Sequence, residues 1–305
     1  MTIGENATDF VGLQVADYAE GSRLAANRAW RIRVEYEAEK PWTDVFEGFL
    51  AAAGASDVRA LVVGNWGDVS TGTDSSEVVR ALVAARGRLP KLEAIFLGDV
   101  TFEESEISWI HQSDVSPLFS AYPKLTHFRV RGGNGLSLGS LEHGELRSLV
   151  VETGGLDASV VRQVAAATLP NLEHLELWLG SHNYGANWEM EDLAPILAGE
   201  HLPALKTLAL RDSEDADAIA LAVSKSPILA RLSVLDLSLG ALSDDGGEAL
   251  LACPAIKRLT RLDLHRHYMS DAMSARLKSL GIDVNLDDPQ GETADKADRY
   301  VAVSE

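Results

Sequence analysis

The hydrophobic positions of this chain fall into a short pattern that recurs along most of its length. An apolar residue, any two residues, an apolar residue, any one residue and a third apolar residue make up stretches such as LSVLDL and LTRLDL. The alternation at the end of each stretch is typical of a short strand. Self-similarity of this kind predicts a repeat array. Eight copies begin at Val58, Leu92, Leu125, Leu146, Leu172, Leu205, Leu232 and Leu259.

Each strand pattern is followed by glycine or polar residues and then by a helical run such as DASVVRQVAAAT or DDGGEALLAC. Prolines support this reading, because proline cannot continue a helix interior and therefore ends the returning segment before the next strand. Strand, loop and helix in repeated order predict parallel strands stacked side by side. The prolines stand two or five residues before a strand pattern, at Pro90, Pro123, Pro170, Pro203, Pro227 and Pro254.

The two ends of the chain have their own patterns, and a repeat array must cap its terminal cores. Alternation in WRIRVEYE predicts a strand and residues 42–53 a helix, so residues 1–57 are expected to form an N-terminal cap. The array itself spans residues 58–286 and closes with IDVNL as a shortened ninth strand. Residues 287–305 form a tail with six acids and two bases. Its composition favours disorder, whereas Tyr300, Ala302 and their neighbours favour docking as an extended strand; both readings stay open.

These motifs resemble leucine-rich repeats, particularly the ribonuclease-inhibitor-like type, and LSVLDLSLGALSDDGGEALL and LTRLDLHRHYMSDAMSARL match best. The resemblance implies an α/β right-handed solenoid, a horseshoe with a parallel sheet on its concave face and helices on its convex face. The chain is also similar to stand-alone bacterial cytosolic proteins of this type, most of them uncharacterised. The asparagine ladder usual in the family is missing here. Its positions hold Trp66, Val100, Gly133, Gly154, Gly180, Ser213, Gly240 and His267.

Composition narrows the classes of partner. The 305 residues are 46% hydrophobic, enough for a sizeable core, and their formal net charge is −19. This charge argues against a nucleic-acid partner and against an anionic membrane surface, because both attract clustered bases. It fits a basic protein or peptide partner, or serves only to keep the protein soluble. A capped array does not need to oligomerise, so we expect a monomer.

The compartment follows from what the sequence lacks. The first ten residues do not combine a basic start with an apolar run, and no stretch approaches the roughly 20 apolar residues of a membrane span. One cysteine, Cys253, cannot form an internal disulfide framework or a cysteine-based zinc cluster. We therefore expect a cytoplasmic protein without a cofactor.

No motif for catalysis stands out in the sequence. There is no phosphate-binding glycine loop with its lysine, no nucleophile elbow and no pair of histidines spaced for a metal on a helix. Asp236 and Asp263 hold equivalent positions in neighbouring copies, with His265 two residues on. Neighbouring strands lie about 4.8 Å apart, so these three side chains form either a solvated polar face or a group able to bind a metal or perform acid–base chemistry.

The loops after the strands are the expected partner surface. They are acidic, whereas basic residues precede the strands, so the two rims of the array are expected to carry opposite charge. Compensation of the helix dipoles by acids at helix N-termini and bases at C-termini predicts the same asymmetry. The acids are Asp99, Glu103, Glu104, Glu106, Asp212, Glu214, Asp215, Asp217, Asp244, Asp245 and Glu248. The bases are Lys91, Lys124, Arg231, Lys257 and Arg258.

Long copies insert aromatic residues into these loops, namely Trp66, Trp109, Tyr184 and Trp188, with Trp178 at an exposed strand position. Such rings suit a binding surface, or they pack beneath their own loops. On the concave face, Arg129, Arg131, Glu152 and Glu176 either select charges on a ligand or pair with one another.

The function favoured by these patterns is a non-enzymatic scaffold that binds a protein or peptide through its concave sheet and the loops after the strands. One alternative is an accessory protein that presents a peptide substrate to a biosynthetic or regulatory enzyme. A second alternative is a metal-assisted enzyme at Asp236, Asp263 and His265.

Overall fold

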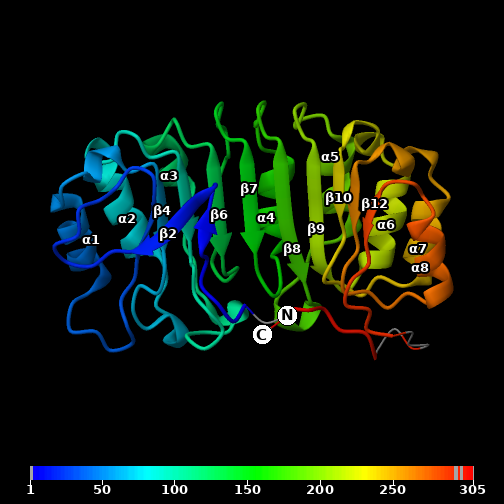
Figure 1. Ribbon diagram of the computed structural model, residues 1–305, viewed down its shortest axis with the longest axis horizontal. Coiled ribbons are helices and arrows are strands. Elements are labelled where there is room, and N and C mark those ends of the chain that lie inside the picture. Colours follow the sequence, from blue (N-terminus) through cyan, green and yellow to red (C-terminus); the bar gives the residue numbers. More distant parts are fainter. Residues whose placement is uncertain (1–2, 292–294, 296–297, 305) are drawn as a thin grey trace. The chain divides into compact units, whose positions relative to one another are not determined.

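The computed structural model describes residues 3–291, 295 and 298–304, which divide into two compact units. The N-terminal unit comprises residues 3–152 and 167–169, and the C-terminal unit comprises residues 153–166 and the described residues from 170 to 304. In the C-terminal unit strands alternate with helices along the chain, whereas in the N-terminal unit some successive strands follow one another without an α-helix between them (Figure 1). The division lies inside the repeat array, where the hydrophobic pattern continues without a break.

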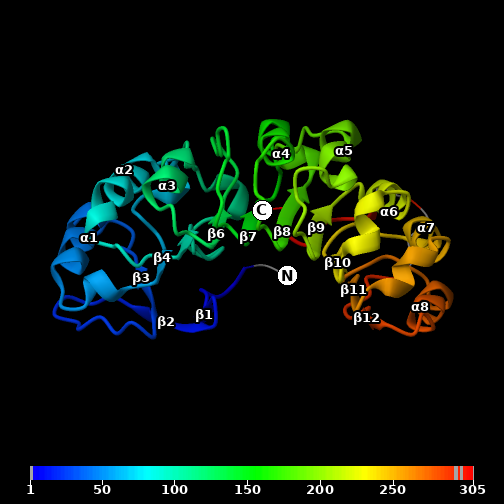
Figure 2. The same cartoon turned by 90° about the horizontal axis from the view of Figure 1, so that it is seen from above.

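The sheet of the N-terminal unit has its strands in chain order. β1 and β2 pair antiparallel, and every later neighbour in the unit pairs parallel. The helices lie together on one face of this sheet (Figure 2). The elements are β1 (Asp9–Phe10), β2 (Leu13–Asp17), β3 (Ala29–Ile32), α1 (Trp42–Ala51), β4 (Ala60–Val63), α2 (Ser76–Ala84), β5 (Ala94–Leu97), α3 (Ser116–Ala121), β6 (His127–Arg131) and β7 (Ser148–Glu152).

The C-terminal unit repeats this arrangement with parallel strands only. Its strand order also follows the chain, and its helices again cover one face of the sheet (Figures 1 and 2). The elements are α4 (Ala158–Ala165), β8 (His174–Gly180), α5 (Met190–Ala198), β9 (Thr207–Ser213), α6 (Ala216–Ser224), β10 (Val234–Asp236), α7 (Asp244–Leu251), β11 (Arg261–Asp263), α8 (Asp271–Lys278) and β12 (Asp283–Asn285).

The α/β solenoid class predicted from the repeats is confirmed in each unit, and so is the shortened ninth strand, which is β12. In-register apolar residues explain the stacking. Leu208, Leu235 and Leu262 are register partners on successive strands, and all three are fully buried. Burying such side chains contributes about 1.5–3 kcal/mol each relative to exposure.

The N-terminal cap contains more than the sequence pattern predicted. The expected strand and helix are β3 and α1, but β3 ends at Ile32 although the alternation continues to Tyr36, and α1 ends two residues earlier than predicted. The hairpin of β1 and β2 was not predicted, because β1 is only two residues long and offers no periodicity to detect.

In the C-terminal unit, where the asparagine ladder is missing, backbone hydrogen bonds join neighbouring repeats. At or just beyond the carboxyl ends of β9, β10 and β11, Asp212, Leu239 and Arg266 adopt positive φ angles of 56°, 68° and 57°. The N–H of each residue donates to a carbonyl oxygen of the following repeat, at 2.9, 3.0 and 2.8 Å. Neighbouring repeats are thereby joined at the point where the chain leaves the sheet. We call these three residues the left-handed row.

Side chains join the loops of neighbouring repeats as well. The Asp217 carboxylate accepts hydrogen bonds from the backbone N–H (2.8 Å) and the hydroxyl (2.6 Å) of Ser243. One repeat later, Asp244 accepts the same pair from Ser270, at 2.8 and 2.7 Å. Ser243 and Ser270 precede α7 and α8 directly, so an acid of one repeat fixes the start of the next helix.

No helix in the described part of the chain has the length and apolar character needed to cross a membrane.

Candidate functional site

Three of the five aromatic residues expected at the surface are buried. Trp66, Trp178 and Trp188 expose only 6, 7 and 3% of their surfaces. Each indole N–H has an acceptor: the Thr73 carbonyl for Trp66, the Leu179 carbonyl for Trp188, and the Glu176 carboxylate for Trp178. The expected exposure of Trp178 was therefore wrong, because its ring is covered and lies 5.3 Å from the Arg211 guanidinium. Tyr184 is partly buried in a short helical turn, residues 182–184.

Trp109 differs from every other tryptophan of the chain. All six lie in the described ranges, and Trp109 is 58% exposed while the other five are at most 7% exposed. Its loop is nevertheless well held, because the neighbouring Ile107 and Ile110 are buried and the Asn134 amide donates to the Ser108 carbonyl at 2.5 Å. The ring is thus presented by an ordered loop and does not belong to the core.

The loop that carries Trp109 is acidic and contains a second exposed ring. Phe102, in the same loop, is 44% exposed. Between residues 99 and 111 the loop carries four acids and no lysine or arginine, and of these Glu103 and Glu106 are exposed. We call residues 102–109 the aromatic–acidic loop. The sequence identified Trp109 and the acids but not Phe102, because nothing in the local pattern distinguishes an exposed phenylalanine from a buried one.

The charged residues of β6 and β7 pair with one another, as one of the two interpretations proposed. Glu152 is buried and binds both arginines, with its carboxylate 2.5 Å from Arg129 and 2.8 Å from Arg131. Both guanidinium groups also lie over the Phe96 ring, at 4.3 and 5.2 Å from its centroid. Arg131 and Glu152 are therefore not available to a ligand, whereas the Arg129 side chain remains 30% exposed.

The helix-free face of the N-terminal sheet is covered by the chain's own N-terminal segment. Phe10 packs against Phe96 with 5.9 Å between ring centroids, and small residues of β3, β4 and β5 complete this apolar cluster. Beside the cluster, the fully buried Asp99 accepts from the Ala7 N–H at 3.1 Å and from Arg31 at 2.9 Å. A ligand cannot reach this part of the sheet without displacing the segment.

In the C-terminal unit a row of charged side chains crosses β8, β9 and β10. Arg211 lies between Glu176 and Asp236, with nitrogen–oxygen distances of 2.8 and 3.4 Å. Burial opposes ionisation of Glu176, but hydrogen bonds from His174 and Trp178 and the charge of Arg211 outweigh it and hold its pKa below the usual range. Burial raises the pKa of Asp236, and Arg211 offsets this only in part.

Asp263 and His265 are brought together as expected, with 2.7 Å between the His265 Nδ1 and the carboxylate. Burial disfavours ionised Asp263, yet His265, Arg261 and Asn285 together keep the pKa of its carboxyl below the usual range. Asp236 is the register partner of Asp263, but its carboxylate lies beside Arg211. Among the residues that the structure describes, no three His, Cys, Asp or Glu side chains are grouped closely enough to hold a metal ion.

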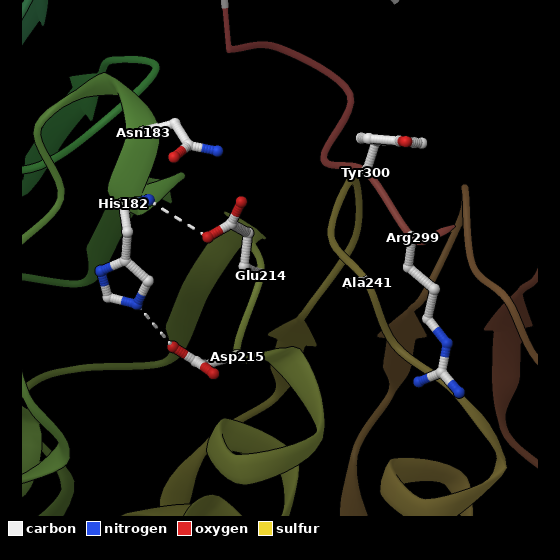
Figure 3. Close-up of a pocket in the computed structure, with 7 residues that line it drawn as sticks. All are labelled: His182, Asn183, Glu214, Asp215, Ala241, Arg299 and Tyr300. Atoms are coloured by element: carbon white, nitrogen blue, oxygen red, sulfur yellow. Dashed lines mark hydrogen bonds and ion pairs between the residues drawn. The ribbon is translucent and has the colours of Figure 1, made fainter. Parts of the chain in front are cut away.

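A cavity of about 370 Å³ opens beside the loop after β8 (Figure 3). His182 stands on one side of it, with Nδ1 2.9 Å from the Ala186 carbonyl and Nε2 3.2 Å from Asp215. These two contacts, the carbonyl first, raise the pKa of His182. Arg299 and Tyr300 of the C-terminal tail form the opposite side, as Figure 3 shows. Sequence reasoning missed this cavity, because its residues come from four separate segments between positions 182 and 300.

The tail itself is ordered where the structure describes it. Val301 and Val303 are buried, and Arg299 lies 3.3 Å from Asp217. Of the two interpretations left open, docking is observed for residues 298–304, although they do not form a strand; residues 292–294, 296–297 and 305 lie outside the described part of the chain.

No protein-family model matches the chain, and no curated protein matches it either. Among solved structures, a similar one is the crystal structure of a Bacteroides fragilis protein determined by the Northeast Structural Genomics Consortium. The two sequences are 32% identical, the match covers 90% of this chain and 76% of the other, and the TM-score is 0.81. An internalin from Listeria monocytogenes is 15% identical over 79% of this chain and 82% of its own, with a TM-score of 0.29, which is too low to support an argument.

Proposed function

The chain belongs to the same protein family as the Bacteroides fragilis protein, and from this starting point we propose that it is a non-enzymatic cytoplasmic scaffold that binds a basic protein or peptide. The observation that carries the proposal is the exposed Trp109 on an ordered loop. Tryptophan is enriched among the residues that dominate binding energy at protein interfaces, since its large rigid ring contributes contact area at a low entropic cost.

The charge of the aromatic–acidic loop supports a basic partner. Glu103 and Glu106 lie on either side of the loop's centre, exposed, with no basic residue between 99 and 111. Opposite charges at the rim of an interface accelerate association and select partners, while a central ring supplies most of the affinity. The proposed surface is therefore the loops after the strands, because on the helix-free face the N-terminal segment packs over the apolar cluster of β3, β4 and β5.

The test is to capture partners from a native lysate with the parent protein and with Trp109→Ala, followed by measurement of the affinity for the captured partner. We expect the substitution to weaken binding by about 30-fold or more, the effect of a residue that dominates an interface. Tyr36→Ala is the matched control, because Tyr36 is 60% exposed in the same unit but outside this loop.

Three results would count against the proposal. Equal binding by the parent and Trp109→Ala would exclude the aromatic–acidic loop as the site. A loss with Tyr36→Ala of the same size would indicate non-specific adhesion of exposed rings. Capture of no partner by any of the three proteins would remove the support for a scaffold.

A further inference from the structure

The C-terminal tail segment, residues 298–304, lies across the left-handed row of the C-terminal unit. Three backbone contacts hold it there. The Tyr300 carbonyl accepts from Arg266 at 2.8 Å, the Ala302 N–H donates to the Leu239 carbonyl at 2.8 Å, and the Val303 N–H donates to the Asp212 carboxylate at 2.9 Å. We call the surface formed by Asp212, Leu239, Arg266, Tyr268 and Gly154 the tail groove.

Most of this recognition is independent of the side chains that dock. Besides the three contacts above, the Tyr268 hydroxyl accepts from the Tyr300 N–H at 2.9 Å and lies 3.0 Å from the Tyr300 carbonyl. Main-chain hydrogen bonds of this kind give affinity for any extended peptide, and pockets for alternate side chains give specificity.

Three side chains of the segment, at alternate positions, contact the C-terminal unit. Val301 and Val303 are buried, exposing 6 and 3% of their surfaces, and Arg299 pairs with Asp217. Tyr300 stands between Arg299 and Val301 in the sequence. Its side chain is 67% exposed, so its ring contributes little contact area to the groove. The groove therefore recognises a basic residue followed, two and four positions later, by β-branched aliphatic residues.

A close approach at Gly154 fixes where the segment can pass. A methyl group added to Gly154 would come within 2.4 Å of the Ser304 carbonyl oxygen, and its three nearest atoms all belong to the Ser304 backbone. Gly154 has no positive φ angle, so an alanine there conflicts with the docked segment and not with its own backbone.

Docking also has an unfavourable component. The segment helps to bury the Asp212 carboxylate completely, and one of its oxygens, Oδ2, finds no hydrogen-bond donor among the described residues. Burying a polar group without a partner is unfavourable, so an occupant of this groove is held less firmly than its other contacts suggest. The preceding residues 287–298 contain no large apolar side chain, so the apolar anchors of this end are Val301 and Val303.

We propose that the tail groove is a binding site for extended peptides of the pattern basic–x–aliphatic–x–aliphatic on a partner protein, and that residues 298–304 occupy it until such a peptide replaces them. This inference rests on the proposed peptide-binding function but concerns a different surface, in the C-terminal unit. Asp217 provides the negative charge for the basic residue, and the left-handed row provides the backbone partners.

The experiment uses a fluorescent peptide with the sequence DRYVAVSE and full-length protein. The double variant Val301→Asp and Val303→Asp removes the docked tail but leaves the groove intact. We expect this variant to bind the peptide at least 10-fold more tightly than the parent, whose attached tail competes at a high effective concentration. Gly154→Ala is expected to bind the peptide poorly, because its methyl group blocks the path. A peptide with Asp at the two valine positions serves as the control ligand.

Several outcomes would overturn the proposal. A folded double variant that fails to bind the peptide would do so, as would equal binding by the parent, the double variant and Gly154→Ala. Dimers of the parent that exchange tails, detected by light scattering, would assign the groove to a second copy instead. None of these readouts involves Trp109, so a failure here leaves the proposed function untouched, and the two failures are distinguishable.

Discussion

Asp212 shows at the scale of one residue how the fold and the tail groove depend on each other. Its φ angle of 56° lies in a region that few non-glycine residues adopt, and aspartate tolerates it better than most. In this conformation the backbone N–H of Asp212 donates to the Ser238 carbonyl of the next repeat, while its carboxylate accepts from the Val303 N–H of the tail. Burial raises the pKa of Asp212 well above its ordinary value, and the hydrogen bond from the Val303 backbone opposes this only partly.

Replacing Asp212 by Asn is expected to stabilise the protein at neutral pH. Because the pKa of Asp212 is raised on folding, the ionised form disfavours the folded state, and protonation relieves this as pH falls towards the unfolded value of about 3.9. The gain from Asp212→Asn should therefore be about 1 kcal/mol at pH 7, or 2–4 °C in Tm, and should shrink towards zero near pH 4.

Thermal unfolding of the parent and of Asp212→Asn between pH 4 and 8 measures this difference. A gain that does not change with pH would mean that folding does not raise the pKa of Asp212. Asparagine also tolerates a positive φ angle, so the substitution changes the charge with little change in backbone preference.

At the scale of an element, the helices of the C-terminal unit begin at positions fixed by the preceding repeat. Asp217 and Asp244 each accept two hydrogen bonds from the serine that precedes the next helix. A short α-helix is marginal in isolation, so such contacts and the packing of its apolar face determine where it starts. These acids were part of the predicted acidic rim, and the structure gives two of them a role within the fold.

Asp244→Ala is expected to lower the free energy of unfolding by about 1–2 kcal/mol, because the backbone N–H and hydroxyl of Ser270 lose their acceptor. The neighbouring Asp245 is exposed and equally acidic, so Asp245→Ala should change stability by less than about 0.5 kcal/mol. Chemical denaturation of both variants makes the comparison. Equal losses would refute a specific role for Asp244.

At the scale of the whole molecule, some charged side chains are buried in ion pairs, and many others contribute to a large negative net charge. The buried pair of Glu152 with Arg131 is shielded from solvent ions. The excess of 46 acids over 27 bases instead produces a net charge of −19, and exposed charges of one sign repel each other. Raising NaCl from 10 to 300 mM should therefore raise Tm at pH 7.5.

The same titration at pH 5 is the control, because partial protonation of carboxylates reduces the net charge and should reduce the effect of salt. A Tm that falls with salt at pH 7.5 would indicate that exposed ion pairs, such as Arg276 with Glu248, stabilise the fold more than the net charge destabilises it.

The sequence by itself determined the repeat, the parallel strands, the ninth strand and the acidic loops. Each of these depends on residues close together in the chain, since a strand's alternation and a helix's period are local properties. Leu208, Leu235 and Leu262 could be predicted as one buried row because the spacing between repeats places them at equivalent positions.

Only the tertiary structure decided which side chains are exposed. The sequence around Trp109 does not set it apart from Trp66, Trp178 and Trp188. Only Trp109 of these four is exposed, because exposure depends on which distant residues pack over each ring. The same holds for Arg131 and Glu152, and for the cover that residues 3–17 and 298–304 give to their units. These contacts include a hydrogen bond between Ile3 and Phe102, 99 positions apart, and no local pattern records a separation of that size.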